Sequence, residues 1–461
     1  MPPPEKPSWL ELAACSDKHI TNVLRVLAAR ESKRYTARAL SQQRQLDPSE
    51  SISIVKPRSA LATFLRRESD VQPHHVEHYS VAAGVHEENR GMNRYLDIIP
   101  YDRTRVIVEE DKDHPQERAG KLHGRYLNAN WVMERFGHKW WIATQAPLRN
   151  TAHAFLSVML QPVVRPPRAD PPKSKTTRIR TVVQLTQNLE SGRKKADPYF
   201  PSEVGKFHVI PPEDGWYTPA LKVTLLDQRV FKKAHCVQST VSISPYRPAQ
   251  RASKESRRRG SGQTDQEQSR VEDVGSEVIF RHLLYLSWPD HGVPDPEDRD
   301  SLLEFIKLVD HTNRDKSHCP IHPLAPPDHL CPELDPDPPI IVGCSAGVGR
   351  TGSFIALSSM LRNYGFLPPA QPIVTTIIHD SPLGPLPNDL KDDLVLQEID
   401  SLREQRPGMV QRTKQTLLIY EVLSDDFARS PRIRRPGTFR PCLLYMQLWI
   451  SISFLPRCAR Q

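Results

Sequence analysis

Residues 340–354 of the chain read Ile-Ile-Val-Gly-Cys-Ser-Ala-Gly-Val-Gly-Arg-Thr-Gly-Ser-Phe. The three β-branched residues at the start predict a buried strand, and the apolar residues from Phe354 to Leu361 predict a helix. Between them, Cys344 and Arg350 enclose a loop of small uncharged residues. Successive backbone N–H groups can point into such a loop, and the helix N-terminus adds positive potential, so the stretch predicts an anion site.

The chemistry of this loop depends on its first and last residues. A thiol at Cys344 would ionise readily, because the N–H donors that hold an oxyanion also hold a thiolate. The planar guanidinium of Arg350 fits two phosphate oxygens at once. A buried structural cysteine in a glycine-rich turn is the alternative, but the agreement of strand, loop and helix favours a reactive residue. The stretch therefore predicts a nucleophilic cysteine that attacks a phosphoryl group.

This stretch resembles the active-site signature of the protein tyrosine phosphatases, the phosphotyrosine-specific Cys-x5-Arg family, here of the non-receptor type. The resemblance covers roughly residues 93–423 apart from insertions. It implies an α/β (α+β) fold, a twisted mixed β-sheet flanked by helices, with the signature loop between a strand and a helix. The chain departs from the family at Gly343, where the family usually has a histidine that favours the thiolate. The resemblance also implies that the phosphate is held by the loop N–H groups of Ser345, Ala346, Gly347, Val348 and Gly349.

Two further segments resemble parts of the family's substrate site. Residues 93–102 resemble the phosphotyrosine-recognition loop, in which Tyr95 would stack on the substrate ring and Asp97 would accept hydrogen bonds from substrate N–H groups. The resemblance further implies that Glu190 holds the signature arginine and that Lys195 contacts the loop carrying the acid. On chemistry alone, residues 93–102 could be an ordinary turn and strand, and residues 190–195 could be a charged turn.

A second chemical motif, Trp-Pro-Asp-His-Gly-Val-Pro, occupies residues 288–294 and follows an alternating strand. Phenolate leaving from phosphorus needs a proton, and a carboxylic acid on a mobile loop can supply one without blocking substrate entry. The motif resembles the family's movable acid loop. Asp290 is therefore predicted to be the acid, with Trp288 as an anchor and Gly292 as a hinge.

The last matching segment, residues 402–411, resembles the family's final motif. The resemblance implies that Gln411 positions the water that hydrolyses the phosphocysteine, and that Gln415 helps to keep this water in place. It also implies that the hydroxyl of Thr351 stabilises the departing thiolate. Because amides in this segment could equally be surface residues, these roles rest on the resemblance.

The chain divides into three parts. A helical extension is expected over residues 1–55, where apolar residues recur at helical spacing, and a tail that is basic and then apolar is expected over 426–461. The phosphatase domain is expected over 56–425. Proline-rich and charged segments within it are predicted to be disordered insertions, near 163–178, 245–275, 312–338 and 365–390.

Composition leaves several partners open. A net charge of +9 is compatible with nucleic acid, an acidic membrane surface or an acidic substrate, whereas the resemblance implies phosphotyrosine-containing proteins and no metal or other cofactor. Histidines and cysteines between His318 and Cys331 match no standard zinc spacing, and nucleic acid is not expected as a partner. Seven scattered cysteines and the lack of an apolar leader predict a cytoplasmic protein, expected to be a monomer. The apolar run 442–455 is short for a membrane span, which makes a membrane partner unlikely beyond a weak C-terminal anchor.

Two other functions compete with the phosphotyrosine phosphatase. Gly343 motivates a catalytically weak phosphotyrosine-binding module, but both Asp290 and Arg350, whose loss could abolish turnover, are present. A dual-specificity or phosphoinositide phosphatase is the other alternative. Phosphoinositide enzymes often carry lysines inside the signature loop, which residues 345–349 lack, and Tyr95 predicts a slot too deep for phosphoserine.

Overall fold

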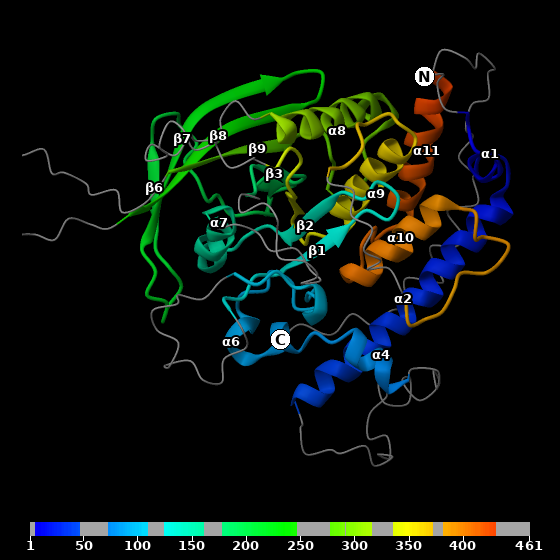
Figure 1. The fold of residues 1–461 in the computed structure, drawn as a ribbon, viewed down its shortest axis with the longest axis horizontal. Coiled ribbons are helices and arrows are strands. Elements are labelled where there is room, and N and C mark those ends of the chain that lie inside the picture. Colours follow the sequence, from blue (N-terminus) through cyan, green and yellow to red (C-terminus); the bar gives the residue numbers. More distant parts are fainter. Residues whose placement is uncertain are drawn as a thin grey trace, which may run out of the picture.

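The computed structural model describes residues 5–46, 72–108, 124–160, 178–246, 277–290, 292–315, 335–371 and 381–429 (Figure 1). One eight-stranded sheet crosses the molecule in the order β1-β2-β10-β3-β9-β8-β7-β6. Its strands are β1 (Ala129–Met133), β2 (Trp140–Gln145), β3 (Thr181–Gln184), β6 (Phe207–Ile210), β7 (Ala220–Phe231), β8 (Cys236–Tyr246), β9 (Val278–Tyr285) and β10 (Ile340–Cys344). The short strands β4 (Leu189–Glu190) and β5 (Arg193–Lys194) form a separate hairpin.

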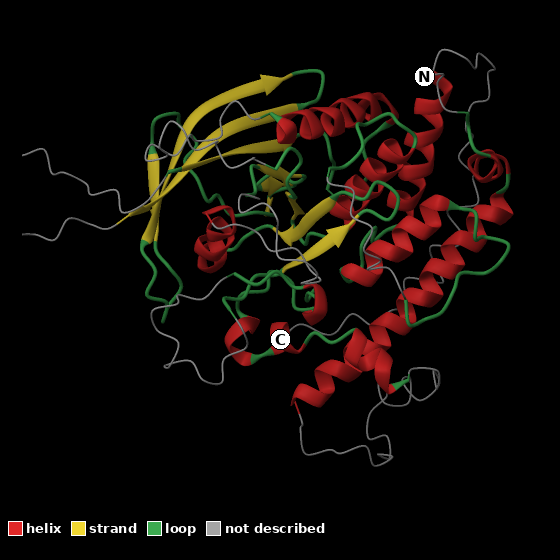
Figure 2. Ribbon diagram, viewed as in Figure 1, coloured by secondary structure: helices red, strands yellow, loops and turns green. Residues whose placement is uncertain are grey.

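The central strands are parallel and the flanking strands are antiparallel. Strands β2, β10, β3 and β9 run parallel to one another, whereas β1, β8, β7 and β6 pair antiparallel with their neighbours. The carboxyl ends of the four parallel strands therefore meet at one edge of the sheet. This is the mixed sheet that the sequence predicts, and helices flank it (Figure 2).

Alternate residues of each central strand face opposite sides of the sheet. Val342 of β10 packs in the same hydrophobic core as Phe354, beneath the helices α8 to α11. Its neighbour Ile341 packs in a second core with Phe155 of α7. Strand β10 is buried on both faces, which explains its continuous apolar run.

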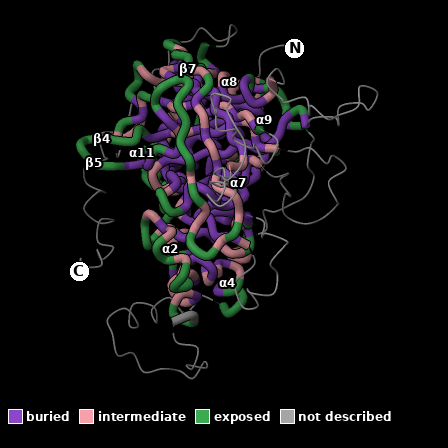
Figure 3. Tube along the Cα trace, turned by 90° about the vertical axis from the view of Figure 1, so that its left-hand side faces the viewer, coloured by how far each residue is buried: buried purple, intermediate pink, exposed green. Residues whose placement is uncertain are grey.

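The helices are unevenly distributed between the two faces. One face carries α8 (Arg299–Arg314), α9 (Gly349–Asn363), α10 (Leu394–Gln405) and α11 (Thr413–Arg429), and the other carries α7 (Ala152–Leu160). Shorter helices precede β1, namely α4 (Pro73–His78), α5 (Ala82–Val85) and α6 (Glu87–Arg90). Figure 3 shows a buried interior and the exposed β4–β5 hairpin, and every residue of β2 and β10 is buried. Among the described residues, no helix is long and apolar enough to cross a membrane.

The N-terminal helices are part of this packed structure. Helices α1 (Ser8–Cys15) and α2 (Asp17–Leu46) bury Leu10, Val23 and Leu27 in the core shared by α8 to α11. Figure 1 shows α2 running beside α10, far from it in sequence. The expected N-terminal helix therefore packs against the domain.

Parts of the expected insertions also belong to the packed structure. Thr312 and Asn313 lie buried in the last turn of α8, and Asp337 is buried beside Lys139. Ser381 hydrogen-bonds to Glu404 of α10. The expectation of disorder was therefore too broad at the ends of the segments 312–338 and 365–390. Most of the other insertion residues, the histidine and cysteine cluster and the tail from residue 430 lie outside the described residues.

Candidate active site

The signature loop lies at the edge of the sheet where the four parallel strands end. Cys344 is the last residue of β10 and is 6% exposed, and α9 begins five residues later at Gly349. The loop curls back so that the N–H of Gly347 donates to Sγ of Cys344 over 3.3 Å. Gly347 has a φ of +70°, and a Cβ there would stand 2.1 Å from the carbonyl oxygen of Thr144. Only glycine fits this turn without strain.

Gly343 also has a local structural reason. Its position in β10 lies against β2, and a Cβ added there would stand 2.8 Å from the carbonyl oxygen of Thr144. A side chain at this position would therefore press on the backbone of the neighbouring strand. The close packing of β10 against β2 thus suits glycine at the position where the family usually has histidine.

We expect Gly343→Ala to lower the free energy of unfolding by about 1–3 kcal/mol, because the new methyl group overpacks the β2–β10 contact. Gly343→His, which installs the family residue, should be at least as destabilising and should not raise the rate. Chemical denaturation measures the first effect and phosphate release the second. Gly91→Ala is the matched control, because a Cβ there meets nothing within 4 Å. Unchanged stability of Gly343→Ala would contradict this prediction, because the β2–β10 contact would then accommodate a methyl group without cost.

Arg350 is held by side-chain and backbone groups from three separate segments. Its two terminal nitrogens donate to the carboxylate oxygens of Glu190 over 2.7 and 2.8 Å. One nitrogen also donates to the carbonyl of Leu185 and the other to that of Pro289, each over 3.0 Å. Burial opposes the charge on the guanidinium, but the hydrogen bonds to Glu190 outweigh it and raise the pKa of Arg350. Burial likewise disfavours the carboxylate, yet the bonds from Arg350 hold the pKa of Glu190 below its usual value.

The acid loop lies over the same site. Asp290 Oδ2 is 2.8 Å from Nζ of Lys195, and its Oδ1 is 3.6 Å from a terminal nitrogen of Arg350. Both Lys195 and Asp290 are largely buried, with side chains 10% and 12% exposed. Trp288 is buried, and its indole N–H donates to the carbonyl of Gly292 over 3.2 Å, which closes the loop on itself. The structure therefore brings Asp290, Lys195, Glu190 and Arg350 together.

The recognition loop forms one wall of the site. The hydroxyls of Tyr95 and Ser345 are 2.8 Å apart, and the Ser345 hydroxyl donates to the carbonyl of Lys195 over 2.8 Å. Tyr95 thus stands beside the signature loop with 36% of its surface exposed, and Asp97 is exposed nearby in the chain. This arrangement leaves an aromatic face available at the mouth of the site.

The three remaining predicted residues lie around α9 and the start of α11. Thr351 is fully buried in the first turn of α9, and its hydroxyl has no hydrogen-bond partner among the described residues. Gln415 is buried against Gly349, where a Cβ would come within 2.8 Å of its amide nitrogen. Gln411 is exposed on the turn between α10 and α11. The structure places Gln415 at the loop and leaves Gln411 open to solvent.

Two arginines that sequence reasoning missed support the loops from behind. Fully buried Arg406 donates to the carbonyls of Gly347 over 2.7 Å and Ala346 over 3.1 Å, and burial lowers its pKa to about 10. Arg94 holds the recognition loop by donating to the carbonyls of Ala146 and Pro147. Both arginines lie inside segments that resemble family motifs, residues 93–102 and 402–411. Because arginine is more often solvated than buried, only this resemblance could have indicated that they support the loops.

Electrostatics and geometry suit this site to a phosphoryl group. The thiol of Cys344, the guanidinium of Arg350 and the N–H of Gly347 lie at the N-terminus of helix α9, where positive potential favours an anion. The carboxyl group of Asp290, which comes from a separate loop, lies across the site and can exchange a proton with a leaving group. Among the described residues, no group of three or more metal-ligating side chains occurs.

Comparison with known proteins gives one family. A family model described as protein-tyrosine phosphatase matches residues 89–365. Receptor-type tyrosine-protein phosphatase eta from Gallus gallus is 26% identical over 319 residues, which cover 67% of this chain and 17% of that protein. Tyrosine-protein phosphatase non-receptor type 20 from Rattus norvegicus is 23% identical over 425 residues, covering 89% of this chain and 69% of that protein. The chain therefore spans only a small part of the receptor-type relative and about two thirds of the non-receptor one.

A solved structure from a study of the PTPN18 fingerprint on distinct HER2 tyrosine phosphorylation sites also aligns with this chain. Its TM-score is 0.47 at 22% sequence identity, and the alignment covers 76% of this chain and 87% of that one.

Proposed function

Because this chain belongs to the protein-tyrosine phosphatase family, we propose that it hydrolyses phosphotyrosine in proteins through a phosphocysteine intermediate. The observation that carries the proposal is the convergence on Arg350. Its guanidinium contacts Glu190 and the backbone of Pro289, and lies 3.6 Å from Asp290. Phosphate capture and proton supply thus come from separate segments that meet at one point.

In the first displacement, Sγ of Cys344 attacks phosphorus as the bond from phosphorus to the tyrosine oxygen breaks. Arg350 and the loop N–H groups hold the phosphate oxygens, where preorganised donors stabilise the transition state. Asp290 gives its proton to the leaving tyrosine oxygen, so a neutral phenol departs. The contact between Asp290 and Lys195 supports this role because it holds the carboxyl group over the site.

In the second displacement, Asp290 takes a proton from water while the water oxygen attacks phosphorus and the sulfur–phosphorus bond breaks. We assign the positioning of this water to Gln411, with Gln415 beside it. The hydroxyl of Thr351 would donate to the departing thiolate. Among the residues that the structure describes, this buried hydroxyl in the first turn of α9 has no hydrogen-bond partner, which supports that role because a donor is left available there.

We also propose that the substrates are phosphotyrosine-containing proteins and that the protein works in the cytoplasm as a monomer. The exposed ring of Tyr95 beside Ser345 supports an aromatic substrate, since stacking requires an accessible face. Cys15, Cys236 and Cys344 are free thiols, which is compatible with a reducing compartment.

Matched phosphotyrosine and phosphoserine peptides test this specificity. We expect turnover of the phosphotyrosine peptide at least about 100-fold faster, because the shorter side chain does not reach the bottom of the slot. Tyr95→Ala should raise KM for the phosphotyrosine peptide about tenfold and reduce the preference. Tyr217→Ala, at another exposed tyrosine, is the control. Equal wild-type rates on the two peptides would indicate a dual-specificity enzyme, and binding without phosphate release would indicate a binding module.

A further inference from the structure

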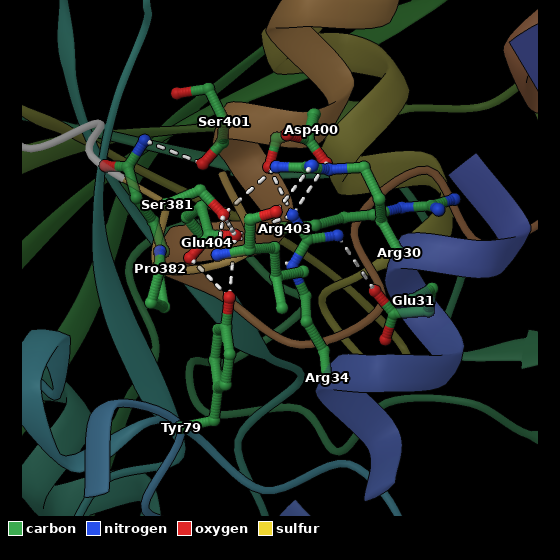
Figure 4. Close-up of polar contacts among 12 residues, drawn as sticks. Arg30, Glu31, Arg34, Tyr79, Ser381, Pro382, Asp400, Ser401, Arg403 and Glu404 are labelled. Carbon is green, nitrogen blue, oxygen red and sulfur yellow. Dashed lines mark hydrogen bonds and ion pairs between the residues drawn. The ribbon is translucent and has the colours of Figure 1, made fainter. Parts of the chain in front are cut away.

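A buried network of charges joins the N-terminal helix α2 to α10. Fully buried Arg34 of α2 donates to Oε1 of Glu404 over 2.6 and 2.9 Å and to Oδ1 of Asp400 over 2.6 Å. One turn earlier, Arg30 donates to the same Asp400 oxygen over 2.9 Å. Figure 4 shows both arginines reaching from α2 to the two carboxylates of α10.

The carboxylate of Glu404 also lies within hydrogen-bond distance of donors from other segments. The hydroxyl of Tyr79 lies 2.9 Å and 3.0 Å from its two oxygens, Ser381 donates over 2.7 Å, and His78 is 3.2 Å away. A fully buried carboxylate with this many donors remains charged, and the pKa of Glu404 is lowered to about 2 although burial alone would raise it. The carboxylate is a rigid attachment point that fixes α10 against α2.

The residue before Glu404 continues this connection toward the active site. Arg403 donates to the carbonyl of Leu27 on α2 over 3.0 Å. Its other nitrogens donate to the carbonyls of Met409 and Val410, each over 2.8 Å. One side chain thus ties α2 to the turn that immediately precedes Gln411.

That turn needs external support. Val410 has a φ of +53°, which is unfavourable for a β-branched residue. Its N–H donates to the carbonyl of Val348 in the signature loop over 3.2 Å, and its carbonyl is held by Arg403. A strained conformation persists only where surrounding contacts determine it, so the placement of Gln411 depends on these two attachments.

The signature loop is held differently. Arg406, which supports that loop, donates its remaining hydrogen bonds to the side-chain oxygens of Asn128 and Asn130, and Gln405 bonds to the backbone of Met133. These partners lie in or next to β1 and not in α2. Loss of the α2 attachment should therefore disturb the turn before Gln411 more than the loop that carries Cys344.

We propose that α2 positions the water-binding turn of the site through Arg34, so that hydrolysis of the phosphocysteine depends on α2 while its formation does not. Arg34 is a positioning residue in this proposal, since it touches neither the substrate nor the reacting atoms. The proposal rests on the proposed function, because it concerns the second step of that reaction. Residues 17–46 lie outside the segment that the family model matches.

The test is steady-state and rapid-quench kinetics of the full chain with p-nitrophenyl phosphate. For a two-step reaction, kcat/KM reports the steps through release of the phenol, whereas kcat also includes hydrolysis of the intermediate. We expect Arg34→Met to lower kcat about tenfold with kcat/KM within about twofold of wild type. The fraction of enzyme trapped as phosphocysteine by acid quench should rise in parallel. A loss of folded protein would lower kcat and kcat/KM equally.

Arg38→Met is the matched control. It makes the same change one turn along α2, where the side chain donates to Tyr101 and Glu31 and not to α10. It should leave both kinetic parameters of the folded protein unchanged. Because Arg34→Met leaves buried carboxylates with less compensation, it could fail to fold. Arg34→Lys then carries the test, since it retains the charge without the planar fork and should lower kcat about threefold at constant kcat/KM.

The outcomes separate the two proposals. With rates expressed per folded molecule, equal loss of kcat and kcat/KM in both Arg34 variants, without accumulation of phosphocysteine, would overturn the positioning role while leaving the enzyme in place. A split of the same size in Arg38→Met would also overturn it, because the effect would not be specific to the attachment of α10. Absence of phosphate release and of phosphocysteine in the wild-type protein would instead overturn the proposed function itself.

Discussion

Cys344→Ser is expected to reduce phosphate release from a phosphotyrosine peptide by at least about four orders of magnitude, because it removes the proposed attacking thiolate. A serine hydroxyl in the same place is a far weaker nucleophile, since it is not ionised near neutral pH. Phosphopeptide binding should persist, because Arg350 and the loop N–H groups remain. Initial rates and equilibrium binding of the same peptide measure the two effects.

Cys236→Ser is the control for this substitution. Cys236 lies buried in β8, and burial raises the pKa of its thiol to about 12, so it should be unreactive. Its replacement should change stability by about 1–2 kcal/mol while leaving the rate per folded molecule unchanged. Turnover by Cys344→Ser within a few-fold of wild type would mean that the nucleophile had been assigned to the wrong residue.

The second large effect is expected from Asp290→Ala, which should lower kcat about 10²- to 10⁴-fold on a phosphotyrosine peptide. The leaving phenolate then departs without a proton, so the loss should be smaller for an aryl phosphate whose leaving group is already acidic. A series of aryl phosphates with leaving groups of increasing pKa measures this, and the variant should show the steeper dependence. The variant should also retain phosphotyrosine proteins, which free phosphotyrosine would displace.

Asp295→Ala provides the comparison, because Asp295 is an exposed carboxylate shortly after the acid loop and its side chain makes no capping hydrogen bond. We expect wild-type kinetics from it. If Asp290→Ala gave the same leaving-group dependence as wild type, the proton would have to come from another group.

The sequence was most informative where chemistry and local pattern coincide. The buried strand before Cys344 and the helix after it follow from apolar periodicity, and the structure contains both. The mixed sheet came from the family resemblance and is confirmed by the strand pairing. The contacts of Glu190 with Arg350 and of Lys195 with Asp290 agree with the expected pairs, whereas the catalytic roles themselves remain predictions.

Partners of buried charges could not be predicted from a single sequence. Arg34 and Glu404 are 370 positions apart, and nothing in the local pattern of α2 marks its arginines as buried. A basic helix is ordinarily read as solvated, because lysine and arginine are rarely fully buried without a partner. The expectation of disorder was too broad near Ser381 for a similar reason, since the proline content of this segment gives no sign of the bond of Ser381 to Glu404.

The way in which Arg350 is held also affects how the protein can evolve. Two of its partners, at Leu185 and Pro289, are main-chain carbonyls, which no substitution removes directly. Only Glu190 contributes a side chain to this set of hydrogen bonds. If Glu190 were replaced by a residue without a carboxylate, the two main-chain carbonyls would still orient Arg350. The anchoring of this arginine is therefore buffered against mutation, and sequence drift at position 190 can weaken phosphate capture without abolishing it in a single step.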